Sequence, residues 1–189
     1  MKKFILLLIV PFLIFSQGEY KLGSYTKERK NNINFEFKKP LKPFEKSQES
    51  YSIQGNANLV TAYSANIYTD PIMLQIYSSI IPKQFRDINW KDIINSKFQS
   101  EQFIEIFLTG GKKLGWNIYD YEVKEINGTL FLEIRSSITT QGVTQKQINW
   151  MSVYNDNLIN ILGATLKNSF DENVRFIKRF AYSVKLNKF

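Results

Sequence analysis

The sequence has neither cysteine nor histidine among its 189 residues. Without cysteine there is no thiol nucleophile and no disulfide, and a cysteine-linked lipid anchor after an export signal is excluded. Without histidine the commonest general base and most zinc or copper ligand sets are absent. The Gly110-Gly111 pair lacks the spacing and the following Lys-Ser/Thr of a phosphate-binding loop. These absences favour a binding protein over an enzyme, and we expect no cofactor.

The sequence also lacks an apolar run long enough to cross a membrane. Its longest apolar stretch covers residues 4–15 and contains Pro11, whereas spanning a bilayer takes about 20 residues. The stretch follows the basic pair Lys2-Lys3 and precedes Ser16-Gln17-Gly18, which is the pattern of a cleaved export signal. We therefore expect residues 1–18 to be a signal peptide, cut after Ser16 or Gly18. The remaining chain is expected to be exported, periplasmic or secreted, with no transmembrane helix and no lipid anchor, and its composition is typical of a bacterial protein.

Basic residues outnumber acidic ones by 25 to 17, which gives a formal net charge of +8. Residues 19–50 are rich in lysine and glutamate and poor in aliphatic residues, so we predict a flexible basic arm at 19–32. A single domain is expected over residues 33–189. A basic run follows in 38–46, where interleaved glutamates favour a solvated linker over a tail that binds anionic polymer; its lysines are Lys38, Lys39, Lys42 and Lys46.

The pattern of apolar residues predicts seven strands and two helical segments. The expected strands cover 33–38, 59–68, 72–81, 117–126, 129–138, 147–154 and 158–166, and the expected helical segments cover 87–114 and the residues after 169. The order is β-β-β-α-β-β-β-β-α. Short turns between strands imply an antiparallel sheet, and the near-continuous apolar character of 158–166 predicts a central position in it. The fold class is therefore α+β, with about six to seven strands flanked by helices in an α/β/α sandwich.

Asn127-Gly128 predicts a tight hairpin between the fourth and fifth strands, because a type I′ turn needs positive φ at both central positions. A two-residue loop sets Ile126 opposite Thr129, Glu122 opposite Glu133 and Tyr119 opposite Ser136. We expect the face opposite to Glu122 and Glu133 to be the core; besides Tyr119 and Ser136 it carries Tyr121, Val123, Leu130, Leu132 and Ile134. For the next hairpin, around 155–157, two- and three-residue loops are both compatible with the sequence.

The register places three carboxylates together: Asp120, Glu122 and Glu133. Like charges directly opposite are unfavourable, so a compensating charge is expected. Lys124 and Arg135 on the same face would screen them at a solvated surface. Two sharper hypotheses are a hard-cation site, since calcium prefers carboxylate oxygens, and a carboxylate with a raised pKa for acid–base chemistry.

The final segment predicts an amphipathic helix. Ser169 and Glu172 have capping-box spacing. An apolar stripe follows at helical spacing: Val174, Ile177, Ala181 and Val184. The basic side chains off this stripe form either a solvated face or a candidate binding patch for an acidic partner or anionic envelope polymer: Arg175, Lys178 and Arg179. Nucleic acid is not an expected partner for an exported protein.

Several stretches resemble the PsbP-like superfamily, which is named for an extrinsic protein of photosystem II. They are the helical segment near 90–108, EINGTLFLEIRSS (125–137), NDNLINILGATL (155–166) and FDENVRFIKRFAYSV (170–184). The resemblance covers about the last 100 residues and includes no catalytic signature. It implies an α/β/α sandwich and, for many members, a binding or assembly role, and it transfers no functional residue. Cystatin-like and NTF2-like sheets are alternatives.

The sequence thus favours a non-enzymatic exported binding or assembly module of the cell envelope, with an envelope protein or an anionic polymer as partner. The alternative is a carboxylate-dependent hydrolase or cation-binding protein that uses Asp120, Glu122 and Glu133.

Overall fold

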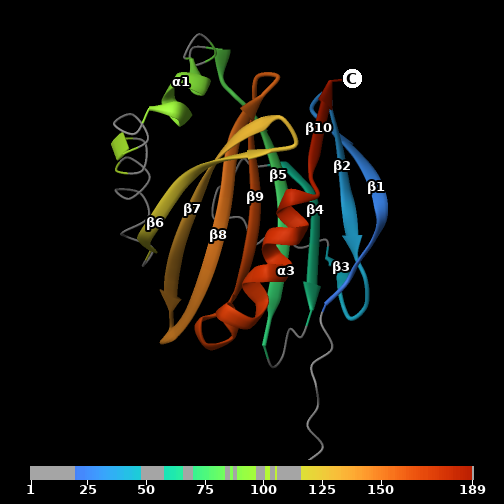
Figure 1. The fold of residues 1–189 in the computed structure, drawn as a ribbon, viewed down its shortest axis with the longest axis vertical. Helices are drawn as coiled ribbons and strands as arrows, with labels where there is room; N and C mark the ends of the chain where they lie inside the picture. The colour runs from blue at the N-terminus through green and yellow to red at the C-terminus, as the bar shows by residue number, and fades with distance from the viewer. Residues whose placement is uncertain are drawn as a thin grey trace, which may run out of the picture.

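The computed structural model describes residues 20–47, 58–65, 70–83, 86, 89–96, 101–102, 105 and 116–188. Within these residues, ten strands form two sheets in which every neighbouring pair is antiparallel (Figure 1). The large sheet contains, in spatial order, β3 (Glu45–Ser47), β4 (Asn58–Ala65), β5 (Ile72–Ile80), β9 (Asn157–Leu166), β8 (Val143–Tyr154), β7 (Thr129–Thr140) and β6 (Trp116–Ile126). The small sheet contains β1 (Leu22–Lys30), β2 (Ile33–Pro40) and β10 (Lys185–Lys188). The helical elements with defined bounds are α1 (Trp90–Asn95), the short 3-10 helix η2 (Lys167–Ser169) and α3 (Phe170–Tyr182).

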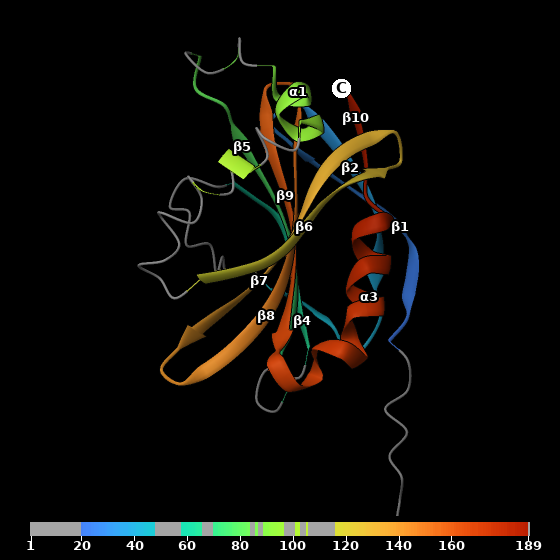
Figure 2. The same ribbon diagram turned by 60° about the vertical axis from the view of Figure 1, so that its left-hand side comes forward.

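The predicted α+β class with an antiparallel sheet is confirmed, and β9 has the central position that its apolar sequence predicted. The layers differ from a simple α/β/α sandwich, because α3 and the small sheet together cover one face of the large sheet (Figure 2). Helix α1 packs on the opposite face, against β7 and β8. The strand order also differs from the prediction, since β1, β3 and β10 were not expected. No helix in the described ranges is long and apolar enough to cross a membrane.

The flexible arm predicted at 19–32 is wrong over residues 22–30, which form β1 and pair with β2. The two strands are joined by Asn31-Asn32, both with positive φ (50° and 61°). Strand β1 is polar, but its partner β2 turns Ile33, Phe35 and Phe37 into the core with no exposure. The polar composition of β1 is typical of a disordered segment. The strand is held in place by its pairing with β2, whose apolar side chains are buried in the core.

The Asn127-Gly128 turn has φ values of 49° and 80°, as a type I′ hairpin requires. The register it predicted is confirmed for Ile126 with Thr129 and for Glu122 with Glu133. It is wrong for Tyr119, because the register shifts between Ile118 and Asp120 and Ile118 takes the place opposite Ser136. The next hairpin has the two-residue turn Asn155-Asp156, with Tyr154 opposite Asn157.

The predicted assignment of the two hairpin faces is wrong. The main core lies on the Glu133 face, where Phe131 and Trp150 are completely buried beneath α3. The face expected to be the core forms a smaller cluster around Leu132 and Ile134, with Ile94 and Met151. Strand β7 therefore carries apolar residues on both faces. The main core forms on the face that α3 and the small sheet cover, because they bury more apolar side chains than α1 does on the other face.

Helix α3 begins at Phe170 as predicted, but the capping box does not form, because the Ser169 side chain makes no capping hydrogen bond. Ile177 and Ala181 of the predicted stripe are buried, together with Phe176 and Phe180. Gly163 in β9 lets the helix approach the sheet, since a Cβ at this position would collide with the Ile177 side chain.

The predicted helical segment 87–114 is described only in part. Residues 90–95 form α1, and residues 101, 102 and 105 are also helical. The other residues of the segment, apart from Asn89 and Ser96 beside α1, lie outside the described ranges.

Candidate functional site

Glu133 is a completely buried carboxylate at the centre of a polar cluster between β7 and α3. Its Oε1 accepts hydrogen bonds from Arg135 Nε and Nη2 at 3.0 and 2.8 Å, and Lys178 Nζ lies 3.4 Å away. Its Oε2 accepts from Trp150 Nε1 at 2.8 Å and from the Tyr182 hydroxyl at 3.4 Å. Both carboxylate oxygens are thus occupied by donors from β7, β8 and α3.

Arg135 extends this arrangement outward to two further carboxylates. Its Nη1 donates to Asp120 Oδ2 at 2.7 Å, and its Nη2 donates to Glu122 Oε1 at 2.9 Å. Lys124 Nζ forms an ion pair with Glu122 at 2.9 Å. We call the whole group the charged cluster; it contains three carboxylates and three cations, namely Asp120, Glu122, Glu133, Lys124, Arg135 and Lys178. Its formal charge is zero.

The pKa shifts in and beside the charged cluster keep each affected group in its usual charge state at neutral pH. The hydrogen bond from Lys124 lowers the pKa of Glu122, and the charges of Lys124 and Arg135 act in the same direction. Burial opposes the charge of Arg135, but its hydrogen bond to Glu133 and the three nearby carboxylates raise its pKa overall. Burial, reinforced by the charge of Glu133, raises the pKa of the Tyr182 phenol, which stays a donor. None of these shifts moves a pKa toward neutrality, as acid–base catalysis would require.

The structure brings together the three carboxylates that the register predicted, and Lys124 and Arg135 compensate them as expected. Asp120 and Glu122 are partly exposed, whereas Glu133 is buried instead of solvated. Arg135 occupies the position between them that a bound cation would take. In the part of the chain that the structure describes, no group of three or more carboxylates is arranged to hold a metal ion. The calcium hypothesis therefore stays a prediction, and the geometry favours an internal cation.

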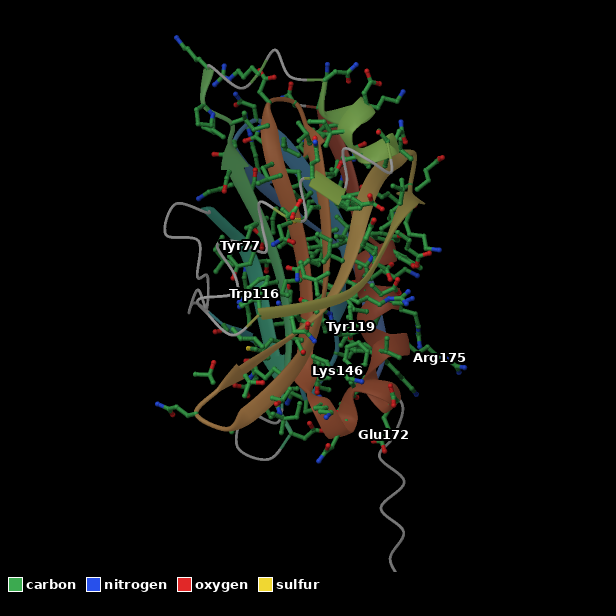
Figure 3. All side chains as sticks on the ribbon, turned by 90° about the vertical axis from the view of Figure 1, so that its left-hand side faces the viewer. Tyr77, Trp116, Tyr119, Lys146, Glu172 and Arg175 are labelled. Carbon is green, nitrogen blue, oxygen red and sulfur yellow. The ribbon has the colours of Figure 1, made fainter. Side chains whose placement is uncertain are left out.

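The predicted basic patch on α3 is divided by the structure. Arg175 and Arg179 are exposed, and Figure 3 shows Arg175 pointing away from the sheet. Lys178 turns instead toward Glu133 and belongs to the charged cluster. The roles of Trp150 and Tyr182 were missed, because their sequence positions give no sign that α3 and β8 meet at Glu133.

A second feature is an open groove at the end of the sheet where α1 packs against β7 and β8, with a volume of about 370 Å³. Apolar side chains of Ile94, Leu130 and Val153 line it, and the exposed Lys91 and Glu125 bring opposite charges to its lining. The volume falls in the range of roughly 300–1,000 Å³ that is typical of ligand pockets. We call this hollow the α1 groove.

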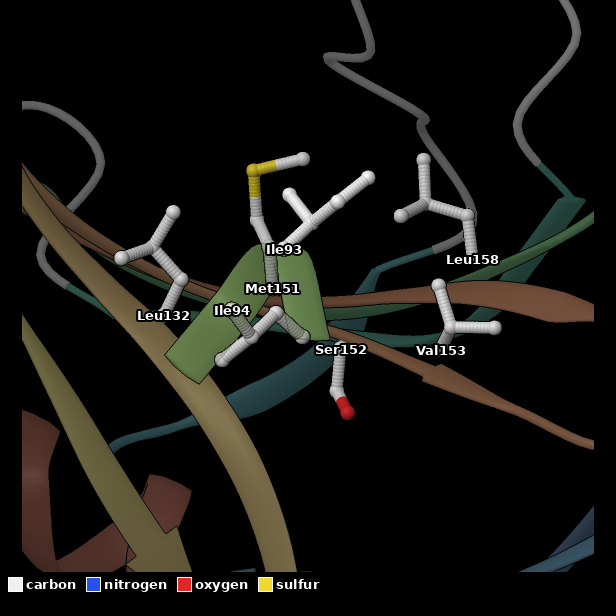
Figure 4. Close-up of a pocket in the computed structure, with 7 residues that line it drawn as sticks. All are labelled: Ile93, Ile94, Leu132, Met151, Ser152, Val153 and Leu158. Carbon is white, nitrogen blue, oxygen red and sulfur yellow. The ribbon is translucent and has the colours of Figure 1, made fainter. Parts of the chain in front are cut away.

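A small apolar cavity of about 20 Å³ adjoins the α1 groove (Figure 4). The two hollows share Ile94, Ser152 and Val153. Leu132, Met151 and Leu158 add further apolar lining to the cavity. The groove is therefore continuous with the smaller of the two hydrophobic clusters.

The arrangement of the two sheets and the helices is that of a PsbP-like fold, as the comparison with solved structures shows. No family model and no curated protein matches the chain. Among solved structures, cyanobacterial PsbP from Synechocystis sp. PCC 6803 matches with a TM-score of 0.57 and 12% identity, over 92% of this chain and 99% of that one.

Two further solved structures are similar to this chain. A Pseudomonas aeruginosa protein of unknown function, described as a putative regulator, matches with a TM-score of 0.50 and 10% identity, over 88% of this chain and 100% of that one. A Bacteroides thetaiotaomicron protein matches with a TM-score of 0.50 and 7% identity, over 89% of this chain and 50% of that one. At these identities the likeness shows the fold alone.

Proposed function

We propose that this chain is a non-enzymatic binding or assembly module of the cell envelope, and that it receives an apolar segment of a partner protein in the α1 groove. The observation that carries the proposal is the groove itself, with its ligand-sized volume and its apolar lining beside two opposite charges. This is the usual composition of a recognition site, in which apolar area supplies affinity and a few polar groups fix orientation.

A binding role is favoured over catalysis by the state of the polar groups near the groove and in the charged cluster. The Ser152 hydroxyl in the groove lining donates to the Leu130 carbonyl oxygen at 2.6 Å. A nucleophilic serine would instead be hydrogen-bonded to a base. The carboxylates of the charged cluster are engaged by arginine, lysine, tryptophan and tyrosine. A general acid or base of a hydrolase would instead be available to exchange a proton with the substrate.

The proposal that the protein is exported to the cell envelope rests on the sequence of residues 1–18, which has a basic start, an apolar stretch and a small-residue cleavage pattern. The PsbP-like fold is compatible with this location and does not establish it.

Site-specific photocrosslinking tests the groove. A benzoylphenylalanine in place of Val153 would sit in the groove, and the same replacement of Val143 provides a matched control on the same strand and the same face. The two positions are ten residues apart, or roughly 33 Å along a strand. Both variants are to be expressed in the native cells, irradiated and analysed by mass spectrometry.

We expect a discrete protein adduct from position 153 and none of that mass from position 143. Val153→Trp, which fills the groove, should abolish co-purification of the same protein, whereas Val143→Trp should preserve it. An adduct that forms equally at both positions, or no adduct at position 153, would contradict the proposal.

A further inference from the structure

The positive charge of the chain is concentrated in the small sheet and the segment that follows it. Residues 20–47 and 185–188 contain ten lysine and arginine residues and three glutamates, a net charge of +7. Residues 1–19 contribute two lysines and one glutamate, or +1, out of the formal total of +8. The rest of the chain therefore has a net charge of zero, with thirteen basic and thirteen acidic residues.

The small sheet has one apolar face and one cationic face. Ile33, Phe35 and Phe37 of β2 point into the core, so the alternate positions point outward. Cross-strand partners share a face, and the pairs Tyr25–Lys38 and Lys185–Glu36 therefore lie on the outer side. Lys27 and Arg29 follow Tyr25 at alternate positions of β1 and are exposed.

This outer face carries four cationic side chains and one carboxylate, Glu36. The carboxylate lies opposite both Lys27 and Lys185 in the register, and Lys185 Nζ is 3.8 Å from it. Glu28 belongs to the opposite side of β1 and pairs with Lys46 at 2.7 Å. Because Glu36 is the one carboxylate that these described strands place on the outer face, the four cations give that face a net positive charge. Strands β1 and β2 lie on the side of the molecule away from β6 (Figure 1).

An aromatic side chain lies among these cations. The Tyr25 ring is 42% exposed, with Lys185 Nζ 4.3 Å and Lys38 Nζ 5.5 Å from its centroid. Tyrosine has an apolar ring and a polar hydroxyl, so it is favoured at the headgroup level of a membrane. A broad sheet face with lysine, arginine and tyrosine combines two features of surfaces that contact anionic lipid.

We propose that the outer face of the small sheet, formed by Tyr25, Lys27, Arg29, Lys38 and Lys185, docks on an anionic phospholipid surface. Charge complementarity with lipid phosphates supplies the attraction. The sheet also follows the apolar segment 4–15 closely in the chain: Phe15 and Leu22 are seven residues apart, which limits their separation to about 25 Å. Until the signal peptide is cut, a bilayer that receives the apolar segment is therefore within reach of the basic face. This surface is distinct from the α1 groove.

Vesicle co-sedimentation of the chain recovered from its own cells tests the docking. The probes are vesicles of phosphatidylcholine mixed with phosphatidylglycerol, and vesicles of phosphatidylcholine alone, which measure any charge-independent insertion. The test variant is Lys27→Gln/Arg29→Gln/Lys185→Gln. The control is Lys167→Gln/Arg175→Gln/Arg179→Gln, which removes the same charge from exposed residues of η2 and α3.

The unaltered chain should bind the anionic vesicles and not the neutral ones, and binding should weaken as salt is raised. Each cation at a lipid surface changes partitioning about fivefold, so the test variant should bind about a hundredfold more weakly and the control should retain most of its binding. Equal binding to both vesicles, no binding to anionic vesicles, or an equal loss in the two variants would overturn the proposal. An equal loss would assign the attraction to net charge rather than to this face. Unchanged melting temperatures would show that both variants are folded.

Discussion

The charged cluster around Glu133 and the outer face of the small sheet contain the same residue types but differ in burial and in charge balance. In the cluster three carboxylates meet three cations at 2.7–3.4 Å, around a Glu133 side chain with no exposure. On the small sheet four cations share one carboxylate, and the side chains reach solvent. A buried charge must be paired to be tolerated, whereas an exposed one need not be. The buried Glu133, rather than the composition of the two regions, therefore makes the charged cluster part of the core, whereas the charges of the small sheet lie at the surface.

The largest expected loss of stability comes from removing Arg135, the central cation of the charged cluster. Arg135→Met would leave Glu133 buried with Lys178 as its nearest cation, 3.4 Å away. Breaking a buried pair from one side typically costs about 3–5 kcal/mol, so we expect a loss of about 3 kcal/mol in the free energy of unfolding. Urea unfolding followed by circular dichroism would measure it.

The matched control is Arg175→Met on the exposed side of α3, which should change the free energy of unfolding by no more than about 0.5 kcal/mol. If the two variants lost similar amounts of unfolding free energy, the charged cluster would contribute no more to stability than an exposed cation on α3, and the prediction would be wrong.

A smaller loss is expected where α3 is held by apolar packing instead of charge. Gly163→Ala places a Cβ against Ile177, and overpacking of this kind costs about 1–3 kcal/mol. Ile177→Ala removes the colliding Cγ2, so the double mutant should lose less than the sum of the two single losses, which a double-mutant cycle in urea would detect. Additive losses in the double mutant would place the strain elsewhere.

Acid should weaken the cluster through Glu122. Its pKa is lowered in the folded state, chiefly by the Lys124 hydrogen bond, from an ordinary value of 4.5. The stability that it contributes is therefore fully present above about pH 4.5 and is lost as the pH falls through the lower folded pKa. Glu122→Gln should flatten the decline of melting temperature in this acid range, by a small amount because the side chain is 38% exposed. An identical acid profile for the two proteins would contradict this assignment.

The smallest expected effect is that of calcium. Because Arg135 already bonds Asp120, Glu122 and Glu133, an added divalent ion would have to displace a guanidinium held by three carboxylates. We expect calcium to leave the melting temperature unchanged relative to the same ionic strength of sodium chloride. A specific rise that disappears in Glu122→Gln would revive the cation site that the sequence suggested.

Local features of this fold could be predicted from the sequence, and long-range ones could not. The Asn127-Gly128 turn fixed the pairing of Glu122 with Glu133, because a two-residue loop leaves only one register. The bulge beside Tyr119 carries no glycine or proline signal and was missed. Strand β1 was predicted to be a flexible arm because its own sequence is rich in lysine and poor in apolar residues. It forms a strand by pairing with the apolar strand β2, which its own sequence does not reveal.

The charged cluster was half predictable for the same reason. The register brought Asp120, Glu122 and Glu133 together, but the face that they occupy was assigned to solvent. Phe131 and Leu132 are both apolar and lie on opposite faces of β7, so the strand's own sequence does not choose between them. The choice is made by α3, whose Lys178 reaches Glu133 from 45 residues further along the chain.

Strand β10 pairs with β2, so that Lys185 lies opposite Glu36, almost 150 residues earlier. The hairpins β6–β7 and β8–β9 need only their own residues, and can form as soon as these have been synthesised. Strands β1 and β2 also form a local hairpin, but the small sheet is complete only when residues 185–188 add β10. A chain threaded across a membrane from its N-terminus would carry this hairpin without its third strand for most of the passage. If the chain is exported as proposed, late closure of this sheet would make the arrival of the last strand the step that completes the fold.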